Sequence, residues 1–134
     1  MKLQMIETLT EKQLIDLQYL YKYVMGRERS IEDLKVMIKN CVVIAICEHE
    51  TDQLIGFCRV ITDGIYRAVI YDVMADSSYQ GKGVGRMLMD KVLEHPLIKS
   101  VERIELYTLD KMSFYEKWGF KVNNTMTIMR RTKV

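Results

Sequence analysis

The sequence predicts an α/β fold with one mixed central sheet and helices on both faces. Three strand-like apolar runs follow one another with only short turns between them, which is typical of an antiparallel meander. The third run is followed by a helix and then another strand, and a helix between two neighbouring strands implies a parallel crossover. The chain of 134 residues is long enough for one proper core. We therefore expect residues 1–134 to form a single domain.

The first half of the chain supplies a strand, two helices and two further strands. Thr10 is a good N-cap for a helix that carries apolar residues at helical spacing and ends at Gly26. Ser30 opens a second helix, which extends to about residue 39. The strands are expected at residues 2–6, 41–47 and 54–61, with a turn at 50–53.

The stretch AVIYDVMADSSYQGKGVGR, residues 68–86, combines a strand, a glycine-rich turn and the start of a helix. The first turn of a helix has backbone N–H groups without intrahelical partners, and the helix dipole adds partial positive charge there. Glycine at positions 81, 83 and 85 leaves this backbone uncovered, so the stretch predicts a site for a phosphate-like anion. It matches neither a dinucleotide fingerprint nor a P-loop, because both patterns require glycine where Arg86 stands.

After this helix, which should end near residue 94, the pattern predicts one more strand, one short helix and two closing strands. The strand is expected at residues 101–106 and the helix at 111–118, with Gly119 as its stop. The closing strands are expected at residues 120–122 and 126–129, around Asn123 and Asn124.

Composition excludes several classes of function. The net charge is +2, from 20 basic and 18 acidic residues, which does not favour nucleic-acid binding. No apolar run reaches membrane-spanning length and the first residues do not resemble a signal peptide, so we expect a cytoplasmic protein without a membrane partner. Three cysteines without a CxxC pair, and only two histidines, predict buried reduced thiols and no metal.

Two motifs resemble the signatures of the GNAT superfamily of N-acetyltransferases. The first is Gln80-x-x-Gly83-x-Gly85, which lies between a strand and an amphipathic helix and resembles the acyl-coenzyme A pyrophosphate loop of that family. The second is SFYEKWGF at residues 113–120, which is similar to the family's C-terminal FYEK-x-GF helix. The two motifs come in the family's order, and the chain is identified as a small single-domain member of bacterial type.

The resemblance implies that acetyl-coenzyme A lies where the strand at 68–74 splays from its parallel neighbour. It also implies that a primary amine of a small molecule or peptide attacks the thioester directly, without an acyl-enzyme. The backbone of the splayed strand would pair with the pantetheine arm, and the loop amides would hold the pyrophosphate. The cofactor-binding residues implied in this way are Val73, Met74, Ala75, Gln80, Gly81, Lys82, Gly83, Val84, Gly85, Arg86 and Tyr115.

Two residues are candidates for catalysis. Tyr115 matches the family tyrosine that protonates the departing thiolate; the alternative is that it only packs its helix on the sheet. Asp72 lies in the middle of an apolar strand, where a lone carboxylate is costly unless it is paired or acts on a ligand. It could bind or deprotonate the amine, or it could be a structural residue bonded to a neighbouring turn or to Arg67. A backbone N–H at Val73 or Met74 would polarise the carbonyl.

A non-catalytic acyl-coenzyme A sensor or partner module with the same fold is the alternative to an enzyme. The presence of Tyr115 favours the enzyme. The sequence does not identify the acceptor amine. It also leaves the oligomeric state open, although exposed edges on the expected C-terminal strands favour a homodimer.

Overall fold

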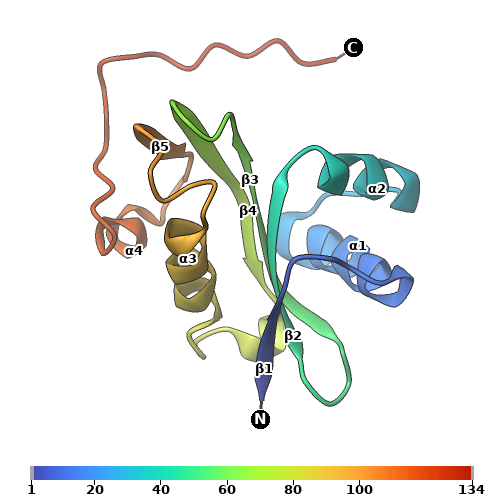
Figure 1. Cartoon of the computed structure of the whole chain (residues 1–134). Coiled ribbons are helices and arrows are strands. Elements are labelled where there is room, and N and C mark those ends of the chain that lie inside the picture. Colours follow the sequence, from blue (N-terminus) through green and yellow to red (C-terminus); the bar gives the residue numbers. More distant parts are fainter. Residues whose placement is uncertain (1, 134) are drawn as a thin grey trace.

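The computed structural model describes residues 2–133 and contains one five-stranded sheet in the order β1-β2-β3-β4-β5. Figure 1 shows helices on both sides of this sheet. The strands are β1 (Leu3–Ile6), β2 (Val42–Glu48), β3 (Leu54–Thr62), β4 (Arg67–Ala75) and β5 (Arg103–Leu106). The helices are α1 (Glu11–Met25), α2 (Ile31–Lys39), α3 (Val84–Glu94) and α4 (Met112–Glu116), with a single 3₁₀ turn, η1 (Ser77–Tyr79), between β4 and α3.

The expected fold class is confirmed. β1, β2, β3 and β4 pair in antiparallel fashion, and β4 and β5 pair in parallel fashion across the α3 crossover. The parallel pair is possible because α3 carries the chain back across the sheet between β4 and β5.

The helix boundaries follow the capping residues that the sequence indicates. The Thr10 side chain accepts from the Gln13 N–H while the Gln13 side chain accepts from the Thr10 N–H, which forms a complete capping box. Gly26 ends α1 in the left-handed conformation at φ 66°. The Ser30 hydroxyl accepts from the N–H of Asp33 at the start of α2.

Each face of the sheet has its own hydrophobic core. On the α1–α2 face, Leu17, Leu20 and Tyr21 of α1 pack with Phe57 of β3 and Met74 of β4. On the other face, α3 packs on the sheet, with α4 beside it. That second core contains Ile46, Cys58, Ile70, Val84, Leu88 and Val92, with Phe114, Tyr115 and Trp118 at its margin.

The two closing strands predicted at residues 120–122 and 126–129 are absent from the described structure. Residues 120–133 form no strand, and 121–133 are all exposed. Figure 1 shows this segment leaving α4 and extending past the body of the fold. A strand needs a partner edge to satisfy its backbone, and within this chain the segment does not lie along one. α4 is also shorter than predicted, because residues 117–119 form a turn.

None of the helices in the described range 2–133 has the length and hydropathy that a membrane span needs.

Candidate functional site

The sheet opens between β4 and β5 partway along the two strands. Their parallel register runs from Arg67 opposite Arg103 to Ile70 opposite Leu106, where β5 ends. β4 continues to Ala75, so its last five residues have no β5 partner. This confirms the splayed parallel pair and leaves the backbone of Val73, Met74 and Ala75 facing the gap on that side.

β4 carries a β-bulge beside this opening. Phe57 of β3 lies opposite Met74 and Arg59 lies opposite Tyr71, so two β4 residues, Asp72 and Val73, occupy the space opposite one β3 residue. Asp72 adopts φ 57°, a left-handed conformation that non-glycine residues rarely take. A bulge bends its strand and re-aims local groups. Here it changes the direction of the amides at the position where β4 leaves β5.

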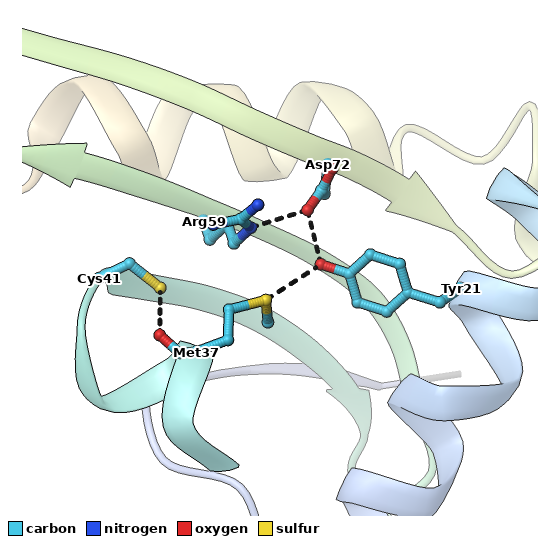
Figure 2. A network of polar contacts seen from close by, with 5 residues as sticks. All are labelled: Tyr21, Met37, Cys41, Arg59 and Asp72. Carbon is cyan, nitrogen blue, oxygen red and sulfur yellow. Dashed lines mark hydrogen bonds and ion pairs between the residues drawn. The ribbon is translucent and has the colours of Figure 1, made fainter. Parts of the chain in front are cut away.

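The carboxylate at the bulge belongs to a polar network on the α1–α2 face (Figure 2). Arg59 Nε lies 2.7 Å from Asp72 Oδ2, and the Tyr21 hydroxyl donates to the same oxygen at 2.6 Å. The side chains of Arg59 and Asp72 are only 22% and 15% exposed. Burial, followed by the hydrogen bond to Asp72, raises the pKa of Tyr21. The prediction that Arg67 could be the structural partner of Asp72 is wrong. Arg67 is exposed, and Arg59 pairs with the carboxylate instead.

Arg59 and Tyr21 are site residues that sequence reasoning missed. Arg59 could have been noticed, because it is the one charged residue in the apolar strand β3, just as Asp72 is in the apolar part of β4. Lone opposite charges on neighbouring apolar strands favour pairing with each other. The contribution of Tyr21 depends on how α1 packs across the sheet, and its spacing indicates only a core residue.

The glycine-rich turn leaves the backbone at the start of α3 uncovered. Gly81 and Gly83 have φ 78° and 82°, and a Cβ at either position would meet nothing within 4 Å. Gly83 caps α3 without any side-chain hydrogen bond. The first bond along α3 runs from the Met87 N–H to the Gly83 carbonyl at 3.0 Å. The N–H groups of residues 84–86 precede that bond, so they are the uncovered donors of the first turn.

Two other glycines bring α3 close to its neighbours. A Cβ on Gly56 of β3 would lie 2.6 Å from Val84 Cγ1, and a Cβ on Gly85 would lie 3.1 Å from Phe114 Cζ. Gly56 therefore permits the first turn of α3 to sit directly on the sheet next to the end of β4. Gly56 is a further residue that sequence reasoning missed, although glycine within a strand often marks such a close approach.

Tyr115 lies on the opposite side of the sheet from the Asp72 network. It belongs to α4, is half-buried, and packs at the margin of the core that contains Cys58. Cys58 is the β3 residue opposite the bulge. Burial, with a smaller effect of Cys58, raises the pKa of Tyr115, so its phenol stays protonated throughout the neutral range.

The cysteines are poor nucleophiles in this fold. Burial raises the pKa of Cys58 to about 12, and burial also raises the pKa of Cys41 and Cys47. The thiolate is the reactive form of cysteine, so these shifts favour the less reactive thiol form at neutral pH.

A mixed sheet that opens between two parallel strands, with an uncovered helix start at the opening, is the architecture of an acetyltransferase domain. The family model for the GNAT acetyltransferase domain matches residues 39–122. The chain therefore belongs to the GNAT acetyltransferase family.

Relatives and solved structures agree with this assignment. The chain is 29% identical over 119 residues to histone acetyltransferase TAP1 of Glycine max, covering 81% of this chain and 52% of that protein. It is 31% identical over 116 residues to the uncharacterized N-acetyltransferase ycf52 of Porphyra purpurea, covering 80% of this chain and 64% of the relative. The chain thus spans about half to two thirds of the length of these relatives.

Two crystal structures share the fold at low sequence identity. An acetyltransferase of Trypanosoma brucei superposes with a TM-score of 0.78 at 22% identity, covering 97% of this chain and all of the other. The glucosamine-6-phosphate N-acetyltransferase of Arabidopsis thaliana superposes with a TM-score of 0.73 at 14% identity, covering 99% of this chain and 100% of the other.

Proposed function

We propose that this chain transfers an acetyl group from acetyl-coenzyme A to a primary amine of a small molecule or peptide. The observation that carries the proposal is the β4 bulge at Asp72, placed where β4 leaves β5. The same strand ends at Ala75, opposite Gly56, which contacts the uncovered first turn of α3. A thioester carrier that lies in this gap would have hydrogen-bond donors at both its acyl end and its diphosphate end.

The diphosphate end would be held by the turn between β4 and α3. The amides of residues 81–86 supply donors, and the left-handed conformations of Gly81 and Gly83 aim them without steric cost. Lys82 and Arg86 are exposed and add positive charge, and Gln80 opens the loop. The backbone of Val73, Met74 and Ala75 would pair with the pantetheine arm as an added strand, because that edge has no β5 partner.

The chemistry requires three functions from this chain. An amide of the bulge, that of Val73 or Met74, donates to the thioester oxygen and stabilises the charge that develops there. The amine nitrogen forms a bond to the acyl carbon as the carbon–sulfur bond breaks. The Tyr115 hydroxyl gives its proton to the departing thiolate. The amine nitrogen gives one proton to solvent and the Tyr115 phenolate takes one proton from solvent, so the protons balance.

Asp72 is proposed to receive the acceptor amine. Both of its hydrogen bonds fall on Oδ2, which leaves Oδ1 outside the Arg59–Tyr21 network. A carboxylate oxygen in this position can attract an ammonium group or accept a proton through water. Asp72 belongs to the α1–α2 face and Tyr115 to the α3–α4 face, so the amine and the thiol carrier would approach the bulge from opposite sides.

Direct attack in a ternary complex fits the cysteine environment. Cys58 is the cysteine nearest in register to the bulge, and its thiol is fully buried with a pKa near 12. An acyl-enzyme on Cys58 would require a thiolate that this environment disfavours. The three free cysteines also fit the reducing conditions of the cytoplasm, where we expect the protein to work.

The test is release of coenzyme A thiol from acetyl-coenzyme A in the presence of a panel of primary amines. We expect turnover with at least one amine and a kcat for Tyr115→Phe that is lower by about 10²–10⁴-fold, with coenzyme A binding retained. Tyr19→Phe is the matched control, because Tyr19 is an exposed α1 tyrosine and its hydroxyl has no assigned role. Binding of acetyl-coenzyme A without turnover across the panel would favour the sensor, and absence of binding would refute both functions.

A further inference from the structure

The helix that carries Tyr115 is too short to fix its own position. α4 spans only Met112–Glu116, and Lys111 at its N-terminal end makes no side-chain capping hydrogen bond. Isolated helices shorter than about 12–15 residues are marginal in water, so α4 needs tertiary contacts in order to form. The place of the Tyr115 hydroxyl therefore depends on how α4 is attached to the rest of the protein.

Trp118 provides the polar contact that attaches this region to another element. Its indole Nε1–H donates to Asp90 Oδ1 of α3 at 2.8 Å. In the part of the chain that the structure describes, every other hydrogen bond of residues 112–120 has its partner within residues 111–119. The bond between Trp118 and Asp90 is thus the hydrogen bond that determines where the end of α4 lies along α3.

Phe114 supplies a second point of attachment, one helical turn before Trp118. A Cβ on Gly85 of α3 would lie 3.1 Å from Phe114 Cζ, so the phenyl ring lies against the bare backbone of this glycine. The rings of Phe114 and Trp118 meet edge to face, with their centroids 4.9 Å apart. α4 therefore lies beside α3 (Figure 1), with Phe114 at the first turn of α3 and Trp118 farther along it.

Two points of attachment restrict α4 more than one does. With Phe114 alone, α4 could pivot about the ring on Gly85, and the hydrogen bond to Asp90 opposes this motion at the other end. Tyr115 packs edge to face on Phe114, with ring centroids 5.0 Å apart, so a pivot of α4 would displace the phenol. Because the uncovered donors of residues 84–86 also belong to α3, one helix sets the spacing between the proposed diphosphate site and the phenol.

From these contacts we propose that Trp118 and Asp90 are positioning residues, which hold the Tyr115 hydroxyl where it can reach the departing thiolate. The inference rests on the proposed role of Tyr115 as the acid. Trp118 occupies the variable position of the FYEK-x-GF motif, so this contact is a property of this chain and does not follow from the resemblance. Asp90 is exposed and Trp118 is half-buried, so loss of their bond should change the stability only slightly.

The test compares variants of Asp90 in the coenzyme A release assay. We expect Asp90→Ala to lower kcat about tenfold, because a displaced proton donor reacts slowly, and to leave the KM for acetyl-coenzyme A within about twofold. Asp90→Asn keeps an acceptor oxygen for the indole and should retain kcat within about threefold. The matched control is Glu94→Ala, which removes an exposed carboxylate one turn farther along α3 and should leave kcat unchanged.

Two further measurements separate positioning from a general structural effect. Asp90→Ala added to Tyr115→Phe should cause no further fall in kcat, because no phenol is left to position. Trp118 is the single tryptophan of the chain, so its fluorescence reports on the hydrogen bond without any need for turnover. Its emission should change in Asp90→Ala and should match the wild type in Glu94→Ala.

Several results would overturn the inference. Unchanged Trp118 emission in Asp90→Ala would mean that the hydrogen bond is not made. An equal fall of kcat in Asp90→Asn or Glu94→Ala would assign the effect to charge. A wild-type kcat in Asp90→Ala, or a further fall in the Tyr115→Phe background, would mean that Asp90 does not act through Tyr115. In all these cases the proposed function would stand, whereas a wild-type protein without turnover would overturn both.

Discussion

The Tyr21 hydroxyl of α1 donates a 2.6 Å hydrogen bond to Asp72 Oδ2, at the β4 residue whose backbone is left-handed. Arg59 donates to the same oxygen from β3, so three elements converge on one carboxylate. The two hydrogen bonds to the Asp72 side chain therefore stabilise the bulged backbone at this residue. The shape of the β4 backbone at the proposed acyl site therefore depends on contacts made on the α1–α2 face of the sheet.

Removal of the carboxylate should destabilise the fold. Asp72→Ala leaves the partly buried Arg59 guanidinium without its counter-ion and the Tyr21 hydroxyl with only the Met37 sulfur as an acceptor, at 3.5 Å. We expect the free energy of unfolding to fall by about 2–4 kcal/mol, measured by urea denaturation. Asp110→Ala is the control: it removes an exposed carboxylate and should change the free energy of unfolding by less than about 0.5 kcal/mol. Equal midpoints for Asp72→Ala and the wild type would show that the network is not structural.

The left-handed backbone at Asp72 predicts an unusual order of stability. Glycine in a strand is normally less favourable than alanine, but only glycine adopts φ 57° without strain. Both Asp72→Gly and Asp72→Ala lose the carboxylate, so their difference reports on the backbone. We expect Asp72→Gly to be more stable than Asp72→Ala by about 1 kcal/mol in the same urea experiment. The usual order, with alanine more stable, would mean that the bulge relaxes once the side chain is removed.

Gly56 should control the position of the α3 start. In Gly56→Ala the new methyl would meet Val84 Cγ1 at 2.6 Å, which forces α3 away from the sheet. We expect a loss of about 1–3 kcal/mol in the free energy of unfolding and weaker coenzyme A binding by calorimetry. The double variant Gly56→Ala/Val84→Ala removes the clashing group and should recover binding in part. If the double variant instead loses as much stability and binding as the two single variants combined, the clash between residue 56 and Val84 is not the cause.

Alkaline pH should destabilise the protein through its buried phenol at Tyr21. The pKa of Tyr21 is raised in the folded state above its ordinary value of 10.0, so the unfolded chain releases this proton at lower pH than the folded chain. The corresponding stability is fully present below about pH 10 and is lost as pH rises toward the folded pKa. Cys58, with a pKa of about 12 against 9.0, adds a similar loss from pH 9 upward.

Urea denaturation at pH values from 8 to 11 measures this effect. Tyr21→Phe should reduce the fall in the free energy of unfolding that begins near pH 10. It should leave unchanged the fall that begins near pH 9, which is due to Cys58. Cys58→Ala should reduce the fall that begins near pH 9 and leave the fall that begins near pH 10. A wild-type free energy of unfolding that stays constant across this range would show that neither group is protonated preferentially in the folded state.

Most of the fold could be predicted because local signals agree with the final arrangement. Thr10 and Gly26 bound α1, Val84 begins α3, and the alternation of strand and helix signals specifies one parallel crossover. The loop at residues 80–86 was recognisable for the same reason, since positive φ at Gly81 and Gly83 depends on the residue type itself. Capping, periodicity and glycine content act within a few residues, so the sequence alone determined these features.

Tertiary structure decided the features that depend on contacts between distant residues. Asp72 at the bulge is bonded to Arg59 and Tyr21, which lie 13 and 51 positions away in the sequence. Gly56 and Val84, which approach each other closely, belong to separate elements. The predicted closing strands failed for a related reason. Their apolar alternation is local, but a strand forms only where an edge is available to pair with it, and the described chain does not bring residues 126–129 to such an edge.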